Sequence, residues 1–133
     1  MNIRHSAVSV IASIGLAVSI HGSAAAQSSA MPETVMVTYH AKAGSETALA
    51  NAIARQWAAA NRLKLVLETP HTLVRGDEQG KTYFVEIFTW RDANTPDAPP
   101  AVIQNIWAEM NQLVESRGGR QGIDFAAVSA VAP

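Results

Sequence analysis

The segment at residues 81–90 constrains the fold more than any other part of the chain, because it is apolar on both of its sides. It is rich in aromatic and β-branched residues, which is typical of strands. Alternate residues of a strand point to opposite faces of its sheet. One face carries Tyr83, Val85 and Ile87, and the other carries Phe84, Phe88 and Trp90. A strand of this kind predicts a sheet that is covered on both faces.

Three other segments have the composition of strands. Residues 34–40 are β-branched and aromatic, and residues 123–131 alternate apolar side chains between two faces. Residues 72–75 predict a short strand between Pro70, which should stop the segment before it, and a glycine-bounded turn at residues 76–80. This strand and residues 81–90 then form a hairpin with a longer loop.

Two segments repeat apolar residues at the three- and four-residue spacing of amphipathic helices. The first begins after Ser45, a candidate N-cap, and should run to about Asn61. The second follows Pro100 and should stop where Arg117 meets Gly118-Gly119. The apolar faces consist of Leu49, Ala52, Ile53, Trp57 and Ala60 in the first helix, and of Ile103, Ile106, Trp107, Met110, Leu113 and Val114 in the second.

The predicted order is therefore β-α-β-β-α-β, which indicates an α+β domain with a ferredoxin-like antiparallel sheet. Right-handed crossovers would place both helices on one face of this sheet. The other face would then need a cover, because the strand at residues 81–90 is apolar on both sides. A second copy of the chain is the simplest cover, and we expect a homodimer.

The N-terminus has the layout of a secretory signal peptide. Arg4 and His5 precede an apolar run of about 14 residues, which is shorter than the ~20 residues of a membrane span. Small residues then allow cleavage after Ala26. We expect residues 1–26 to be removed, residues 27–133 to form one domain, and the protein to work in the periplasm or outside the cell.

Charge and cysteine content limit the partners of the mature chain. Residues 27–133 keep nine of the ten basic residues and all eleven acidic ones, which leaves a formal charge near −2. This balance favours neither nucleic-acid binding nor stable membrane association after cleavage. The sequence has no cysteine, so it forms no disulfide and no thiolate metal site.

Several stretches resemble one known family. Val35-Met-Val-Thr-Tyr39, the aromatic strand Tyr83-Phe-Val-Glu-Ile-Phe-Thr-Trp90 and Ile106-Trp107-Ala-Glu-Met110 are similar to the antibiotic-biosynthesis-monooxygenase-like family. The likeness extends over residues 34–131. It implies a ferredoxin-like subunit, a dimeric α/β barrel made by two packed sheets, and a small cavity between each sheet and its helices.

The same resemblance implies a range of activities. Family members include oxygenases of aromatic polyketides that bind no cofactor, haem-degrading enzymes and quinol oxygenases. Relatives often carry a histidine just before the second helix, whereas residues 97–100 of this chain read Asp-Ala-Pro-Pro. The resemblance therefore favours an oxygenase without a bound cofactor, but it supplies no histidine at that position.

Glu86 is the candidate catalytic residue that the sequence marks most clearly. It shares one side of its strand with Phe84 and Phe88, and a carboxylate on an apolar face is costly unless it is paired. Burial would raise its pKa and suit it to act as a general base. The structural alternative is an ion pair with Arg75 on the neighbouring strand.

The other candidate site residues are histidines and aromatic residues. His40 and His71 could each move protons, or both could join Glu86 at a metal, although their spacing is not that of a metal motif and we expect no metal. The candidate substrate-binding residues are Tyr39, Trp57, Phe84, Phe88, Trp90, Trp107 and Arg75.

Two functions therefore remain open from the sequence. The first is a small exported monooxygenase without a bound cofactor that acts on a hydroxylated aromatic or quinol-like molecule. The second is a non-catalytic dimeric module that binds a small apolar ligand. The same aromatic residues would line the cavity in both cases.

Overall fold

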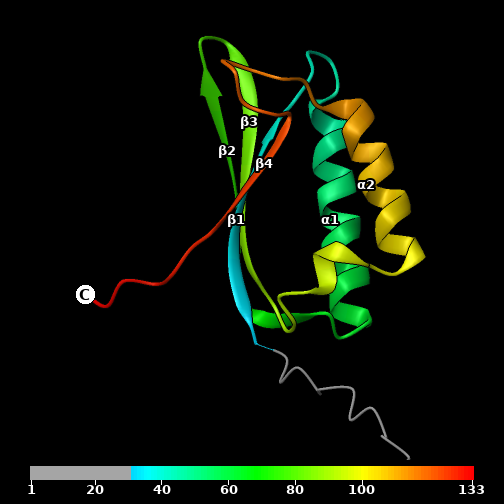
Figure 1. Ribbon diagram of the computed structural model, residues 1–133. Helices are drawn as coiled ribbons and strands as arrows, with labels where there is room; N and C mark the ends of the chain where they lie inside the picture. Colours follow the sequence, from blue (N-terminus) through cyan, green and yellow to red (C-terminus); the bar gives the residue numbers. More distant parts are fainter. Residues whose placement is uncertain (1–30) are drawn as a thin grey trace, which may run out of the picture.

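A computed structural model describes residues 31–133, so the expected signal peptide lies outside the described residues. The element order is β-α-β-β-α-β, as the sequence predicts (Figure 1). The elements are β1 (Glu33–His40), α1 (Glu46–Arg62), β2 (Val66–Glu78), β3 (Lys81–Trp90), the 3-10 helix η1 (Thr95–Asp97), α2 (Ala101–Leu113) and β4 (Ile123–Ala127). No helix within residues 31–133 is long and apolar enough to cross a membrane.

The four strands form one antiparallel sheet in the order β2-β3-β1-β4. Both helices pack on the same face of this sheet (Figure 1). This arrangement confirms the ferredoxin-like α+β prediction. The strands β1 and β3, which are the most apolar in sequence, occupy the two central positions.

The core lies between the sheet and the helices. Val35, Val37 and Tyr39 of β1 alternate toward the helices, as do Phe84, Phe88 and Trp90 of β3. Leu49 and Ile53 of α1, with Ile103 and Met110 of α2, cover them. The helix periodicity in the sequence therefore identifies the buried helix faces correctly.

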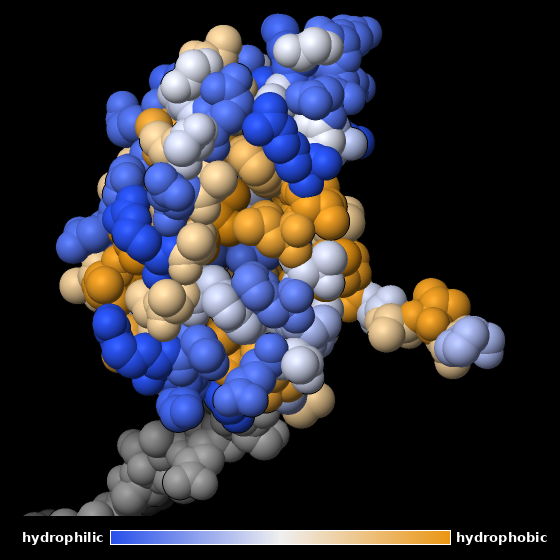
Figure 2. Space-filling model, turned by 180° about the vertical axis from the view of Figure 1, so that it is seen from behind, coloured by the Kyte–Doolittle hydropathy of each residue, from blue (hydrophilic) through white to orange (hydrophobic). Residues whose placement is uncertain are grey.

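No helix of residues 31–133 covers the opposite face of the sheet. The pairing registers place Met36, Val74, Val85 and Ile87 on this outer face, where Met36 is 37% exposed and Val74 is 52% exposed. Figure 2 views the molecule from behind Figure 1, along the layers, and there orange apolar residues gather near the middle, between blue polar residues at the top and bottom. The residues after β4 run away from the body on the side opposite the helices, and Val131 is almost fully exposed (Figure 1).

The strand β2 is much longer than the sequence predicts. It runs through Pro70 and Gly76, which were expected to limit it, and its register shifts between Val66 and His71. Proline is tolerated there because β2 is an edge strand with one unpaired side. The hairpin turn therefore shrinks to Gln79 and Gly80, both with positive φ angles, which suits a tight two-residue turn.

The helix α2 ends earlier than the sequence predicts. It stops at Leu113, because Val114 is extended and bridges to Ala41 beyond the end of β1. Arg117 lies outside the helix and donates hydrogen bonds to the carbonyl oxygens of Ala41 at 2.8 Å and Thr82 at 3.0 Å. Gly118-Gly119 still forms a turn, with both φ angles positive, but it does not end the helix.

Candidate functional site

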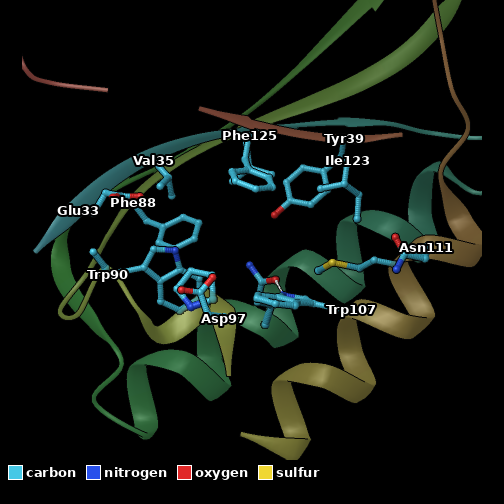
Figure 3. Close-up of a pocket in the computed structure, with 15 residues that line it drawn as sticks. Glu33, Val35, Tyr39, Phe88, Trp90, Asp97, Trp107, Asn111, Ile123 and Phe125 are labelled. Atoms are coloured by element: carbon cyan, nitrogen blue, oxygen red, sulfur yellow. Dashed lines mark hydrogen bonds between the residues drawn. The ribbon is translucent and has the colours of Figure 1, made fainter. Parts of the chain in front are cut away.

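A cavity of about 420 Å³ lies between the sheet and α2. In Figure 3, Tyr39, Ile123 and Phe125 lie on its sheet side, Trp107 lies on its helix side, and Phe88 and Trp90 close one end. Fifteen residues line it: Glu33, Val35, Val37, Tyr39, Gln56, Phe88, Trp90, Ala93, Pro96, Asp97, Trp107, Met110, Asn111, Ile123 and Phe125. Most of the wall is apolar and aromatic, which suits a flat, apolar ligand.

The aromatic end of the cavity is a continuous cluster. The rings of Phe88 and Trp90 meet edge to face with centroids 5.0 Å apart, and those of Trp90 and Trp107 do so at 6.3 Å. Phe88 and Trp90 point inward because they are two residues apart on β3, while Trp107 comes from the inner side of α2. Edge-to-face packing fixes ring positions, so this wall has a defined shape.

Polar groups gather on the inner wall around Glu86, which is 0% exposed. The Tyr39 hydroxyl donates to Glu86 Oε1 at 2.9 Å, and Gln56 Nε2 donates to the same oxygen at 3.4 Å. His71 Nε2 lies 3.1 Å from Glu86 Oε2. Both carboxyl oxygens are therefore satisfied, which makes burial of this group tolerable.

The environment raises the pKa values of two acidic groups. Burial raises the pKa of Glu86, while the hydrogen bonds of His71 and Tyr39 partly offset this effect. Burial, followed by the nearby charge of Glu86, raises the pKa of Tyr39 well above its ordinary value. Tyr39 thus keeps its proton, and Glu86 can exist as a carboxylic acid at higher pH than an exposed glutamate.

Two tryptophans hold the partners of Glu86. The rings of Trp57 and His71 stack with centroids 3.7 Å apart and planes only 3° apart. Trp107 Nε1 donates to Gln56 Oε1, which leaves the Gln56 amide nitrogen to face Glu86. Helix α1 therefore orients His71 through Trp57, and helix α2 orients Gln56 through Trp107.

Four of the candidate substrate-binding residues line the cavity: Tyr39, Phe88, Trp90 and Trp107. Trp57 contacts His71 instead, and Phe84 lies in the core. Arg75 is exposed and donates to the Thr82 hydroxyl at 3.0 Å. The prediction that Arg75 pairs with Glu86 is wrong, because His71 occupies that side of the carboxyl group.

The two histidines lie at different places. His71 joins Glu86, but His40 is on the other face of the sheet, where its Nδ1 lies 3.0 Å from the carbonyl oxygen of Gln121. The alternative in which both histidines meet Glu86 at a metal is therefore wrong. Within residues 31–133, no group of three histidine, aspartate or glutamate side chains is placed to hold a metal ion.

Sequence reasoning missed several lining residues. Gln56 falls on the apolar stripe of α1, three residues after Ile53, and this polar interruption was a usable signal. Asp97 lines the cavity from η1, just before α2. Asn111 and Phe125 carried no comparable signal, because nothing in the sequence shows that β4 and α2 face one opening.

Comparisons with known proteins support the fold. No family model matches the chain, and no curated protein matches it. The structure of Rv0793 from Mycobacterium tuberculosis aligns with a TM-score of 0.55 at 11% identity, covering 77% of this chain and 98% of that chain. The crystal structure of a conserved protein from Methanosarcina mazei Go1 aligns with a TM-score of 0.56 at 9% identity, covering 75% and 93%. Both matches are matches of fold. At such low identity they carry no activity to this chain.

Proposed function

We propose that this domain is a small monooxygenase that needs no bound cofactor and acts on a hydroxylated aromatic or quinol-like molecule. One observation carries the proposal: the wall of the cavity is mostly apolar and partly aromatic, and on its inner side the Tyr39 hydroxyl donates to a buried carboxyl group. An aromatic ring fits the walls, and a ring hydroxyl fits the polar spot. The resemblance to the antibiotic-biosynthesis-monooxygenase-like family agrees with this assignment.

The residues of the cavity would divide the work of binding and proton transfer. Phe88, Trp90 and Trp107 would hold the ring by edge and face contacts and keep water away. The ring hydroxyl would lie against Tyr39 and the Gln56 amide. Tyr39 would pass its own proton to Glu86 while it takes the proton of the ligand, which leaves the ligand as a phenolate.

The remaining chemistry belongs to the ligand and dioxygen. The electron-rich phenolate gives one electron to dioxygen, and the two radicals join through a new C–O bond at a ring carbon that bears hydrogen. The peroxide takes back a proton and loses water, which breaks the O–O and C–H bonds and forms a C=O bond. A phenol and dioxygen thus give a quinone and water, with the ligand as the source of all electrons.

Oxygen uptake tests this function directly. Hydroquinones and dihydroxynaphthalenes should consume oxygen faster with the protein than without it, and yield hydroxyquinones that carry one oxygen atom from dioxygen. Tyr39→Phe and Glu86→Gln should each lower the rate by about 100- to 10,000-fold, the usual contribution of acid–base groups. Tyr83→Phe is the matched control, because Tyr83 lies on the other face of the sheet. Equal rates for Tyr39→Phe and Tyr83→Phe would refute the assigned site.

One observation favours the second function, a module that only binds a small apolar ligand. Glu86 touches the cavity through Tyr39 and Gln56 and is not itself part of the wall. In that case aromatic molecules would change tryptophan fluorescence on binding, and no oxygen would be consumed. The two functions share a ligand class and differ only in turnover.

The proposal includes the setting in which the domain works. A second copy of the chain would cover the outer face of the sheet, where Val74 and Met36 are exposed. Export through the N-terminal segment would place the dimer in the periplasm or outside the cell. The low net charge agrees with a small-molecule ligand in place of nucleic acid or membrane.

A further inference from the structure

The two oxygens of Glu86 hold partners from two different strands. Oε1 accepts from Tyr39 of β1, and Oε2 lies against His71 of β2. Since β3 runs between β1 and β2, the carboxyl group bridges a residue that lines the cavity and a residue on the edge strand. The three side chains form one continuous line of hydrogen bonds across the sheet.

The registers explain why these side chains meet. Glu86 lies opposite Val37 on β1 and opposite Leu73 on β2. Tyr39 and His71 each lie two positions from those residues, so they share the face of Glu86 and reach it diagonally. Such a line depends on long side chains at alternate positions of three neighbouring strands.

Exposure differs along the line. Tyr39 is 2% exposed and Glu86 is 0% exposed, whereas the side chain of His71 is 26% exposed. His71 does not line the cavity. The line therefore has one end at the ligand and the other end at the solvent beside α1.

We propose that Tyr39, Glu86 and His71 form a proton path that carries the proton of a bound hydroxyaromatic ligand to the solvent, with His71 as the outlet. The path rests on the proposed function, because that function supplies the proton. His71 is thus a positioning and proton-transfer residue that acts through Glu86 and does not touch the ligand.

Each proton along the path is accounted for. At the start Glu86 is a carboxylic acid whose Oε2–H donates to the bare Nε2 of His71. The ligand O–H bond breaks as the Tyr39 oxygen gains that proton, the Tyr39 proton moves to Oε1, and the Oε2 proton moves to Nε2. Tyr39 ends with one proton as before, and Glu86 ends as a carboxylic acid whose proton has moved from Oε2 to Oε1 and must return to Oε2 before the next transfer. The ligand is a phenolate, and the imidazolium of His71 gives its proton to water.

The surroundings suit these roles. Burial raises the pKa of Glu86, which agrees with a carboxylic acid at the start. Trp57 stacks on His71 and holds the ring edge toward Glu86. Arg55 of α1 pairs with Glu109, and Arg75 of β2 bonds to Thr82. Glu86 and Tyr39 are therefore the ionisable groups that hydrogen bonds connect to His71.

Nitrogen-15 NMR of the histidine rings tests the path without any substrate. Tyr39→Phe removes a donor to the carboxyl group, so the Glu86–His71 pair should hold its protons to higher pH. The nitrogen-15 signal of His71 Nε2 should therefore move, because the hydrogen bond from Glu86 Oε2–H to Nε2 changes, although Tyr39 does not touch His71. His40, on the other face, is the control in the same spectrum, and Tyr83→Phe is the control variant. An unmoved His71 Nε2 signal would overturn the path.

A probe ligand tests the coupling to the cavity. Bound 4-nitrophenol can leave its charge beside Tyr39 and its proton on the path, so it should also move the His71 Nε2 signal. Its methyl ether, 4-nitroanisole, has no hydroxyl proton and should bind without this shift, and Tyr39→Phe or Glu86→Gln should abolish the shift. A shift that survives in Glu86→Gln would overturn the path.

The two proposals can fail separately. If Tyr39→Phe moves the His71 Nε2 signal but no hydroxyaromatic molecule consumes oxygen, the path stands and the monooxygenase function falls. If oxygen uptake depends on Tyr39 while His71 responds to neither Tyr39→Phe nor 4-nitrophenol, the function stands and the path falls. If 4-nitrophenol does not bind, the cavity is not a site for hydroxyaromatic ligands.

Discussion

At the scale of single residues, Glu86 determines how the site behaves. A fully buried carboxyl group is costly, and here three side chains from β1, α1 and β2 satisfy it. Burial still disfavours the charged form of Glu86, and its pKa is therefore raised. Glu86 therefore ties the chemistry of the site to the stability of the fold.

The raised pKa makes stability depend on pH in a defined direction. The folded protein keeps the Glu86 proton to higher pH than the unfolded chain does. The contribution of this group is therefore full below the ordinary pKa of glutamate and is lost as the pH rises through the folded value. Relative to Glu86→Gln, which has no such proton, the wild type should lose up to about 1.4 kcal/mol of unfolding free energy per pH unit in that window. Urea denaturation at a series of pH values measures this difference.

Two control variants isolate the effect. Glu78→Gln removes an exposed carboxylate from the hairpin and should leave the pH dependence of stability as it is. Arg75→Met should also leave it unchanged and cost no more than about 1 kcal/mol, because Arg75 is exposed and bonds only to Thr82. If Arg75→Met changed the pH dependence of stability, Arg75 and Glu86 would form an ion pair that the structure does not contain.

The sequence identifies Glu86 but not its partners. Period-two alternation is enough to place a carboxyl group among Phe84 and Phe88 on the core side. The partners depend on registers between strands and on which helix residues face the sheet, and neither can be derived from local patterns. Local patterns therefore suggest Arg75 in place of His71 as the partner of Glu86, and they do not place Gln56 beside it.

At the scale of elements, the hairpin β2–β3 depends on the close approach of the Tyr83 ring to Gly76. Gly76 lies opposite Tyr83 on the outer face, and the Tyr83 ring occupies the space that a Cβ atom at Gly76 would need. The glycine therefore makes room for a ring inside the strand and does not mark a turn.

Gly76→Ala should destabilise the hairpin by overpacking, at a cost of about 1–3 kcal/mol. In a Tyr83→Ala background, where the ring is absent, Gly76→Ala should cost less than it does in the wild type. Thermal or urea unfolding gives both differences. An equal cost of Gly76→Ala in both backgrounds would show that the ring is not the cause.

An element can be predicted from the sequence when the pattern that defines it lies within its own segment. The strands β1 and β3 and the helix α1 agree with the sequence within a residue or two, because their periodicity is internal to each segment. The sequence predicts too short a strand for β2, because proline and glycine, here Pro70 and Gly76, usually interrupt strands. Their tolerance depends on an edge position and on Tyr83 across the hairpin. The end of α2 depends on the bridge between Val114 and Ala41, which joins residues far apart in sequence.

At the scale of the whole molecule, the uncovered face of the sheet favours self-association. A protein made of residues 27–133 should have twice the monomer mass in light scattering at low micromolar concentration. Val74→Glu should shift it toward the monomer without unfolding it, because Val74 is 52% exposed in the single chain. In a symmetric dimer each variant introduces two charges into the interface, and every 1.4 kcal/mol lost weakens the dimer tenfold.

Ala58→Glu is the matched control for this experiment, because it adds the same charge on the exposed side of α1. It should leave the mass unchanged. A monomer in the unmodified protein would mean that the apolar outer face is left open to solvent.

The strand order β2-β3-β1-β4 has a consequence for how such a protein can change. Residues from β4 and α2 shape much of the cavity, while His71 and Trp57 come from β2 and α1 at the opposite edge of the sheet. Substitutions in β4 and α2 could therefore alter ligand selectivity while the contacts around Glu86 stay intact. A library confined to positions 110, 111, 123 and 125 is accordingly a rational place to begin redesigning the pocket for a new ligand.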